Sequence, residues 1–119
     1  MGIIKENELR LGNWIEGRSH YKKDFVTFQV YKETFFDIES TYGEFKPIQL
    51  TEEWLLKFGF ELDEHSDTYN LCNSEYNEMC IEGYLQLEMN VMGVNVRVKY
   101  VHELQNLFFV LNKKELIIK

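Results

Sequence analysis

Few residues in this chain have the chemistry of a catalytic or metal-binding centre: it holds three histidines and two cysteines. His102 precedes Glu103, but neighbouring residues of a helix do not face each other, so its useful partner would be Asn106, one turn later. His65 lies in the acidic stretch DEHSD. That stretch lacks the spaced oxygen ligands and the glycine of a calcium loop, so we expect a solvated turn. We expect both histidines to be structural or incidental.

The cysteines give no stronger signal. Cys72 and Cys80 are separated by seven residues, and neither belongs to a C-x-x-C pair. Buried thiols in a reducing compartment explain them, and a disulfide between them is the alternative. The sequence has no phosphate-binding loop, dinucleotide fingerprint, G-x-S-x-G or H-E-x-x-H motif. We therefore expect a protein that is not an enzyme, with no catalytic residue, metal or cofactor.

Aromatic residues make up 15% of the chain, and many of them fall in its first third. A small sheet has few inward positions, so some of these side chains should point outward. Exposed aromatic rings on a small β platform bind peptides or bases. The alternative is that they fill the core between sheet and helices. The candidate binding residues are Trp14, Tyr21, Phe25, Tyr31 and Phe35.

The charge is negative and uneven. The 119 residues carry a net charge of −7. Residues 1–47 hold seven Lys or Arg against eight Asp or Glu, and residues 48–119 hold six against twelve. An acidic body disfavours nucleic acid, whose phosphates supply most non-specific affinity, so we expect a protein partner. The basic residues Arg18, His20, Lys22 and Lys23 are expected in a solvated loop.

The chain has no apolar run of about 18 residues, the length that spans a membrane. Its first residues, MGIIKENELRLG, have no continuous apolar segment of signal-peptide length. We expect a cytoplasmic protein.

Alternating patterns predict strands over Asn13–Glu16, bounded by Gly12 and Gly17, over Phe25–Tyr31 and over Thr34–Glu39. A turn is expected over Ser40–Glu44. The run PIQLTEEWLLKFGF at 47–60 predicts a short helix that Thr51 caps and Gly59 ends. Trp54, Leu55 and Phe58 share one face of it, and burial of Trp54 would make Trp54→Ala cost about 3–5 kcal/mol.

The second half predicts an acidic loop over Glu61–Asp67 and short strands over Tyr69–Cys72 and Glu78–Ile81. A β-hairpin follows, from Leu85–Val91 to Val94–Tyr100, with Glu88 facing Arg97 or Lys99. Apolar spacing predicts a helix over Val101–Leu111 whose outer face carries His102, Glu103, Gln105 and Asn106. Glu115–Lys119 is expected to be a strand.

These elements predict an α+β fold in one domain, residues 1–119. Residues 1–46 would form a small antiparallel sheet or partial SH3-like barrel. Residues 47–119 would pack a short central helix, an antiparallel β-hairpin and a C-terminal helix on it.

Three segments together, ENELRLGNWI, PIQLTEEWLLKFGF and YVHELQNLFFVL, cover about a third of the chain. As a set they resemble a family of small uncharacterised proteins encoded by phages, prophages and mobile elements of Bacteroides-type bacteria. The resemblance implies a phage or mobile-element context and a cytoplasmic site of action. It implies no catalytic role for any residue.

We therefore expect a non-enzymatic, phage-type binding protein that acts on a host or phage macromolecule, most of all a protein. A second hypothesis is the binding or sequestration of a nucleotide signal in evasion of host defence. A third is a homo-oligomeric structural component, which the wide apolar stripe of the last helix suggests.

Overall fold

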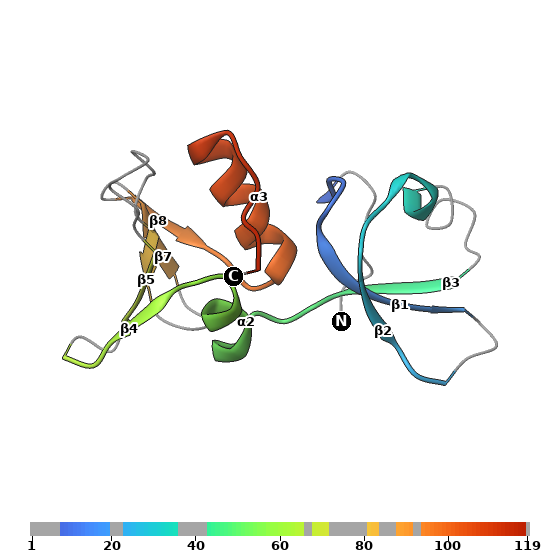
Figure 1. The fold of residues 1–119 in the computed structure, drawn as a ribbon, viewed down its shortest axis with the longest axis horizontal. Helices are drawn as coiled ribbons and strands as arrows, with labels where there is room; N and C mark the ends of the chain where they lie inside the picture. Colours follow the sequence, from blue (N-terminus) through green and yellow to red (C-terminus); the bar gives the residue numbers. More distant parts are fainter. Residues whose placement is uncertain are drawn as a thin grey trace. The chain divides into compact units, whose positions relative to one another are not determined.

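The computed structural model describes residues 8–19, 23–35, 43–65, 68–71, 81–83, 88–91 and 94–118. The chain divides into two compact units (Figure 1). The first consists of Met1–Ile48 and Tyr100–His102, and the second of Gln49–Lys99 and Glu103–Lys119. Helices and antiparallel sheets occur together, so the predicted α+β class is confirmed. The expectation of a single domain stays a prediction.

The first unit contains the small antiparallel sheet that the sequence predicted, although its third strand is not the predicted one. Its strands are β1 (Trp14–Ser19), β2 (Val26–Gln29) and β3 (Gly43–Pro47), in the order β2-β1-β3. Ile15 on the central strand lies opposite Phe28 on β2 and Pro47 on β3. Leu9, Ile15 and Val30 form the buried cluster of this unit, and the rings of Phe28, Phe35 and Phe45 pack against it.

A tight turn leads into the central strand. The Asn13 N–H donates to the Arg10 carbonyl over 3.1 Å, and Gly12 between them has a φ of +90°. That left-handed conformation suits glycine because it has no Cβ to clash. The Asn13 side chain is buried and accepts a hydrogen bond from the Arg10 N–H at 2.7 Å. Gly12 therefore bounds the strand as predicted.

Gly17 does not end the strand, which corrects the second predicted boundary. It lies inside β1, opposite Val26 and Phe45. A Cβ placed there would lie 2.8 Å from Phe45 Cδ1 and 2.9 Å from Phe28 Cε1. The missing side chain lets those two rings approach, with centroids 6.2 Å apart in an edge-on arrangement. Glycine at this position is thus a packing requirement of the strand.

Two further expectations for the first unit are wrong. Thr34 and Phe35 were expected to begin a strand but belong to a helical turn over residues 32–35, and residues 36–39 lie outside the described part. Thr34 explains the turn: its N–H donates to the Tyr31 carbonyl at 3.0 Å, and its Oγ1 accepts from the Tyr31 N–H at 3.2 Å. β3 begins at Gly43, inside the predicted turn, because residues 43–47 pair with β1.

The second unit begins with the predicted short helix, α2 (Glu52–Lys57). Thr51 Oγ1 accepts a hydrogen bond from the Trp54 N–H, and Gly59 follows the helix with a φ of +95°. Leu55 and Phe58 are fully buried. Trp54 is only half-buried, which corrects the expectation that it is a core residue. The Tyr69 hydroxyl donates to the Glu52 carboxylate and so joins α2 to the neighbouring sheet.

That sheet has five antiparallel strands in the order β4-β5-β6-β7-β8. They are β4 (Glu61–Asp63), β5 (Thr68–Leu71), β6 (Ile81–Gly83), β7 (Glu88–Val91) and β8 (Val94–Arg97). The hairpin β7–β8 is confirmed, with Glu88 opposite Arg97, but its second strand ends at Arg97 instead of Tyr100, and residues 85–87 lie outside the described part. The predicted acidic loop is partly wrong, because Glu61–Asp63 pairs with β5 as an exposed edge strand. Cys72 and Cys80 lie outside the described residues.

The last helix, α3 (Val101–Asn112), is confirmed, and its apolar residues Val101, Leu104 and Phe108 are buried, but its buried face is wider than expected. His102 and Gln105 were expected outside, and each is 1% exposed. The His102 ring stacks on Tyr100, with centroids 5.9 Å apart, and its Nε2 lies 3.6 Å from Glu8 Oε2. Residues 115–118 form no strand, although Leu116 is buried.

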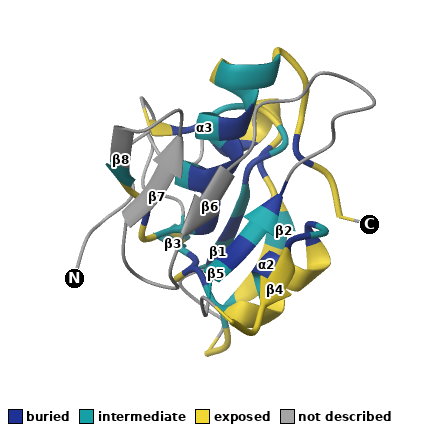
Figure 2. Ribbon diagram, turned by 90° about the vertical axis from the view of Figure 1, so that its left-hand side faces the viewer, coloured by how far each residue is buried: buried dark blue, intermediate teal, exposed yellow. Residues whose placement is uncertain are grey.

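Helix α2 carries both buried and exposed residues (Figure 2). Trp54 within it and Phe58 directly after it offer a direct test of the core of the second unit. We expect Phe58→Ala to cost about 3–5 kcal/mol, because a fully buried ring leaves a cavity. Trp54→Ala should cost at least about 1 kcal/mol less, since part of its ring stays in water. Urea unfolding followed by circular dichroism measures both. An equal loss for the two variants would contradict the observed burial.

Gly17 can be tested in the same way. Gly17→Val should destabilise the chain by about 1–3 kcal/mol, because its Cβ must displace the Phe28 and Phe45 rings. The control is Gly17→Val in a Phe45→Leu background, where the smaller side chain leaves room and the added cost should fall. A cost that is the same in both backgrounds would show that the rings do not cause it.

Candidate functional site

The sheet of the first unit has one face against its core, and its other face carries partly exposed side chains among the residues that the structure describes. Along β1 the buried Ile15 and Gly17 alternate with the half-exposed Trp14, Glu16 and Arg18. Successive side chains of a strand point to opposite faces, so these last three share the open face. The neighbouring strands place Gln29 opposite Trp14 and Lys46 opposite Glu16. We call this surface the open face.

The Phe25 ring contacts two cations on the open face. Phe25 directly precedes β2, and continuing the register of β1 and β2 places it opposite Arg18. The Arg18 Cζ lies 4.5 Å from the Phe25 ring centroid, and the Lys46 Nζ lies 4.1 Å from it. A cation within about 6 Å of a ring centroid is attracted by the ring's π electrons. One half-buried ring therefore holds two cations from two other strands.

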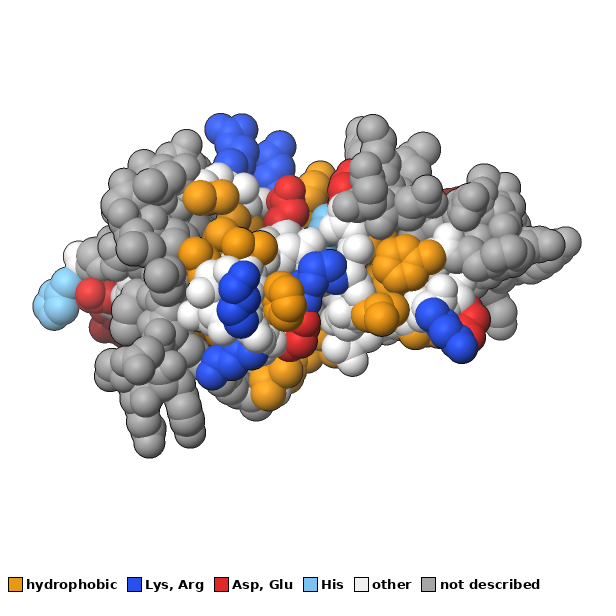
Figure 3. All heavy atoms as spheres, turned by 90° about the horizontal axis from the view of Figure 1, so that it is seen from above, with side chains coloured by type: hydrophobic (Ala, Val, Ile, Leu, Met, Phe, Trp, Pro, Cys, Tyr) orange, Lys and Arg blue, Asp and Glu red, His pale blue; other side chains and the backbone are white. Residues whose placement is uncertain are grey.

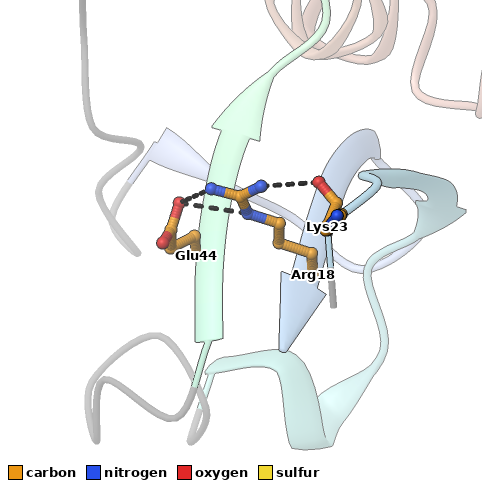
Figure 4. Close-up of polar contacts among 3 residues, drawn as sticks. All are labelled: Arg18, Lys23 and Glu44. Carbon is orange, nitrogen blue, oxygen red and sulfur yellow. Dashed lines mark hydrogen bonds and ion pairs between the residues drawn. The ribbon is translucent and has the colours of Figure 1, made fainter. Parts of the chain in front are cut away.

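The Arg18 guanidinium is fixed on both sides (Figure 4). Its Nη1 donates to the Lys23 carbonyl at 2.6 Å. Its Nη2 and Nε donate to the same Glu44 oxygen, at 2.9 and 3.3 Å. The Arg18 and Glu44 side chains are 28% and 48% exposed, so water screens this ion pair. Arg18 is thus held in place while its partner carboxylate stays accessible.

Lys46 differs from Arg18 because it forms no ion pair with a described carboxylate. In the part of the chain that the structure describes, its ammonium group contacts the Phe25 ring, and no carboxylate forms an ion pair with it. Glu16 lies opposite Lys46 in the register, but the ammonium turns to the ring instead. The open face therefore offers a cation beside an aromatic ring and next to a fixed guanidinium.

The structure separates the aromatic residues that the sequence proposed for binding. Trp14 and Phe25 belong to the open face. Tyr31 is 53% exposed, follows β2, and meets the Phe28 ring edge-on with centroids 6.4 Å apart. Phe35 packs against the buried cluster of Leu9, Ile15 and Val30. Tyr21 lies outside the described residues.

Other exposed hydrophobic side chains are scattered over both units, and several lie next to Lys or Arg (Figure 3). Within the first unit these are Leu11, Val26 and Tyr31. Within the second they are Leu56, Leu62, Val110, Ile117 and Ile118. In the second unit the Lys57 Nζ also lies over an aromatic ring, 5.0 Å from the Trp54 centroid, but it pairs with Glu53 at 3.1 Å.

The residues considered for catalysis or metal binding do not assemble into a site in the described part of the chain. His102 is buried in the first unit. His65 is exposed on the turn after β4, where its N–H donates to the Asp63 carboxylate at 3.0 Å. No group of three or more His, Cys, Asp or Glu residues that could hold a metal ion occurs among the residues described.

Sequence reasoning missed the cations of this site. Arg18 was expected in a loop, yet it lies in β1 because the strand continues through Gly17. The alternation of Trp14, Glu16 and Arg18 was the signal that would have revealed it. Lys46 carried no local signal, since only pairing of β3 with β1 brings it to Phe25.

No protein-family model, curated protein or solved structure matches this chain. Among the described residues, no helix combines the length and the apolar character needed to cross a membrane.

The contacts of Arg18 can be separated by double-mutant cycles. We expect a coupling of about 0.5–1 kcal/mol between Arg18→Ala and Phe25→Leu, as for a partly exposed cation and ring. The coupling between Arg18→Ala and Glu44→Gln should be at most about 1 kcal/mol and should shrink in 0.5 M salt, which screens exposed charges (the Debye length is then about 4 Å). Chemical denaturation with urea gives both values. A zero coupling to Phe25 would contradict the contact.

Proposed function

We propose that this protein is a non-enzymatic binding protein and that the open face of its N-terminal sheet receives a protein partner. The observation that carries the proposal is the Phe25 ring with the cations of Arg18 and Lys46 over it. A few residues supply most of the binding energy at protein interfaces, and Trp, Tyr and Arg are enriched among them. Trp14 adds a second half-exposed aromatic ring to the same face.

The geometry reduces the cost of binding at this face. Arg18 already has its guanidinium held by Lys23 and Glu44, so less side-chain freedom is lost when a partner binds. Lys46 rests on Phe25 in the same way. A preorganised cluster of this kind supports recognition more than a set of freely moving surface lysines does.

Charge favours protein over nucleic acid as the partner. The net charge of −7 opposes the approach of a phosphate backbone. On the open face itself, Arg18 and Lys46 are accompanied by Glu16 and Glu44. Such a mixture of charges suits the polar rim of a protein interface, whereas a nucleic-acid surface needs a continuous basic stripe.

The absence of catalysis is part of the proposal. His102, whose Nε2 lies 3.6 Å from Glu8 Oε2, is 1% exposed and stacked on Tyr100, so a substrate cannot reach it without opening the fold. His65 sits on an exposed acidic turn. A general acid or base must be within reach of the substrate, which His102 is not, and the described contact of His65 with Asp63 involves its backbone N–H and not its ring.

We also propose a phage or mobile-element context and a site of action in the cytoplasm of a bacterial host, where the partner is a host or phage macromolecule. The three segments of the resemblance support this. Two of them contain α2 and α3 with buried flanking residues, and the third, ENELRLGNWI, leads into β1 and includes Trp14 of the open face.

Capture from bacterial lysate tests the proposal. The tagged chain should retain a protein that survives nuclease treatment and binds again after purification. Phe25→Ala, Lys46→Ala and Trp14→Ala should each weaken that purified interaction about tenfold or more, equivalent to about 1.4 kcal/mol. The matched control is Lys57→Ala, which removes another lysine from above an aromatic ring, and it should change the affinity less than about twofold.

Three results would count against the proposed function. One is that nothing is retained at low salt. Another is that nuclease removes all that is retained, which would favour nucleic acid. The third is that Phe25→Ala and Lys57→Ala behave alike, which would place the binding surface elsewhere.

A further inference from the structure

The edges of the two sheets differ in how they are protected. The edge strand β3 contains Glu44, Lys46 and Pro47, and the edge strand β4 contains Glu61 and Asp63. Charges and proline on an edge discourage pairing with another chain. β8 ends in Arg97. β2, with the sequence VTFQ, is the edge strand of the described sheets that has neither a charged residue nor a proline.

The register shows which backbone groups of β2 point outward. The Val30 N–H donates to the Asn13 carbonyl at 2.7 Å, toward the central strand. Hydrogen-bonded and non-hydrogen-bonded positions alternate along an antiparallel pair. The backbone N–H and C=O of Phe28 and Val26 therefore also point to the central strand β1, while those of Thr27 and Gln29 point to the outer edge. No described strand pairs with that edge.

The side chains beside this edge are of two kinds. Val26 belongs to the core face, opposite Gly17, yet it is 62% exposed. On the open face the edge carries Phe25 with its two cations, Arg18 and Lys46. An added strand would place one set of side chains against Val26 and the alternate set beside Phe25.

From these features we propose that the partner binds by adding an extended segment to the outer edge of β2, a segment in which apolar residues alternate with acidic ones. The inference rests on the proposed function and specifies its mode of binding. The backbone of Thr27 and Gln29 would hold the segment. Its apolar side chains would cover Val26, and a carboxylate would approach the cations at Phe25.

An acidic side chain is favoured by the state of those cations. Lys46 has no ion pair with a described carboxylate. The Arg18–Glu44 pair is exposed, so its exchange for a partner's carboxylate costs little. Glu16 and Glu44 on the same face would repel a second or third acidic side chain of the added segment. The segment therefore needs a carboxylate at one position beside Phe25, with uncharged residues on either side of it on that face.

Thr27→Pro tests the inference without disturbing the pairing of β1 and β2. Proline removes only the outward Thr27 N–H and blocks the approach of a further strand, and edge strands tolerate it at such a position. The matched control is Thr27→Val, which keeps the N–H and the β-branched shape. Circular dichroism and urea unfolding establish that both variants are folded.

The probe is a displayed library of random twelve-residue peptides, selected on the full-length chain. Enriched peptides are expected to alternate apolar and polar residues and to contain Asp or Glu. Their affinity should fall at least tenfold on Thr27→Pro and change less than twofold on Thr27→Val. N-methylation of alternate amides should abolish binding when it falls on the edge that faces β2 and should be tolerated on the other edge.

The outcomes separate the mode of binding from the function. Peptides that bind Thr27→Pro as well as the parent chain but lose affinity on Phe25→Ala would overturn strand addition and leave the open face as a binding surface. Enrichment of basic peptides, or of none, would overturn the inference whatever the lysate capture shows. Loss of binding on Thr27→Pro together with dimerisation of the parent chain through β2 would make a second copy the occupant and would also overturn it.

Discussion

The first unit depends on the absence of a side chain at Gly17. The rings of Phe28 and Phe45 approach this position from the two neighbouring strands, and a Cβ would lie within 3 Å of both. The two rings contact each other and pack against the buried cluster that contains Ile15. The flanking residues Glu16 and Arg18 then face the other way, so the geometry of the open face follows from the packing beneath it.

The sheet register converts this packing into the surface that we propose for binding. Arg18, Phe25 and Lys46 come from or next to three different strands, and they meet because β2 and β3 both pair with β1. The cluster would be lost if either strand shifted by one residue, since such a shift turns every side chain to the opposite face. The fixed position of Arg18 between Lys23 and Glu44 therefore reflects the whole sheet and not only its local sequence.

Elements with strong local signals could be predicted from the sequence. α2 has its cap at Thr51 and its stop at Gly59, and the β7–β8 hairpin and α3 follow clear periodicities. The mispredicted segments are those whose conformation comes from pairing. β3 and β4 carry charged residues that favour turns, and only their partner strands make them extended. The burial of His102 and Gln105 likewise depends on what surrounds α3, because apolar spacing predicts the burial of Val101, Leu104 and Phe108 but not that of the two polar residues beside them.

The candidate site divides in the same way. Aromatic content indicated Trp14 and Phe25, but not the cations that lie over Phe25, because only the pairing of β3 with β1 brings Lys46 to that ring.

The overall composition is acidic, but contact with the proposed partner depends on the charges near Phe25. An exposed ion pair contributes about 0–1 kcal/mol, so exchanging Glu44 for another carboxylate supplies little affinity by itself. The exchange instead selects which segment fits, and the hydrogen bonds along β2 with the burial of Val26 must supply the affinity. A surface that combines a neutral strand edge with one small charged cluster can thus be selective for a partner although the protein as a whole carries a net charge of −7.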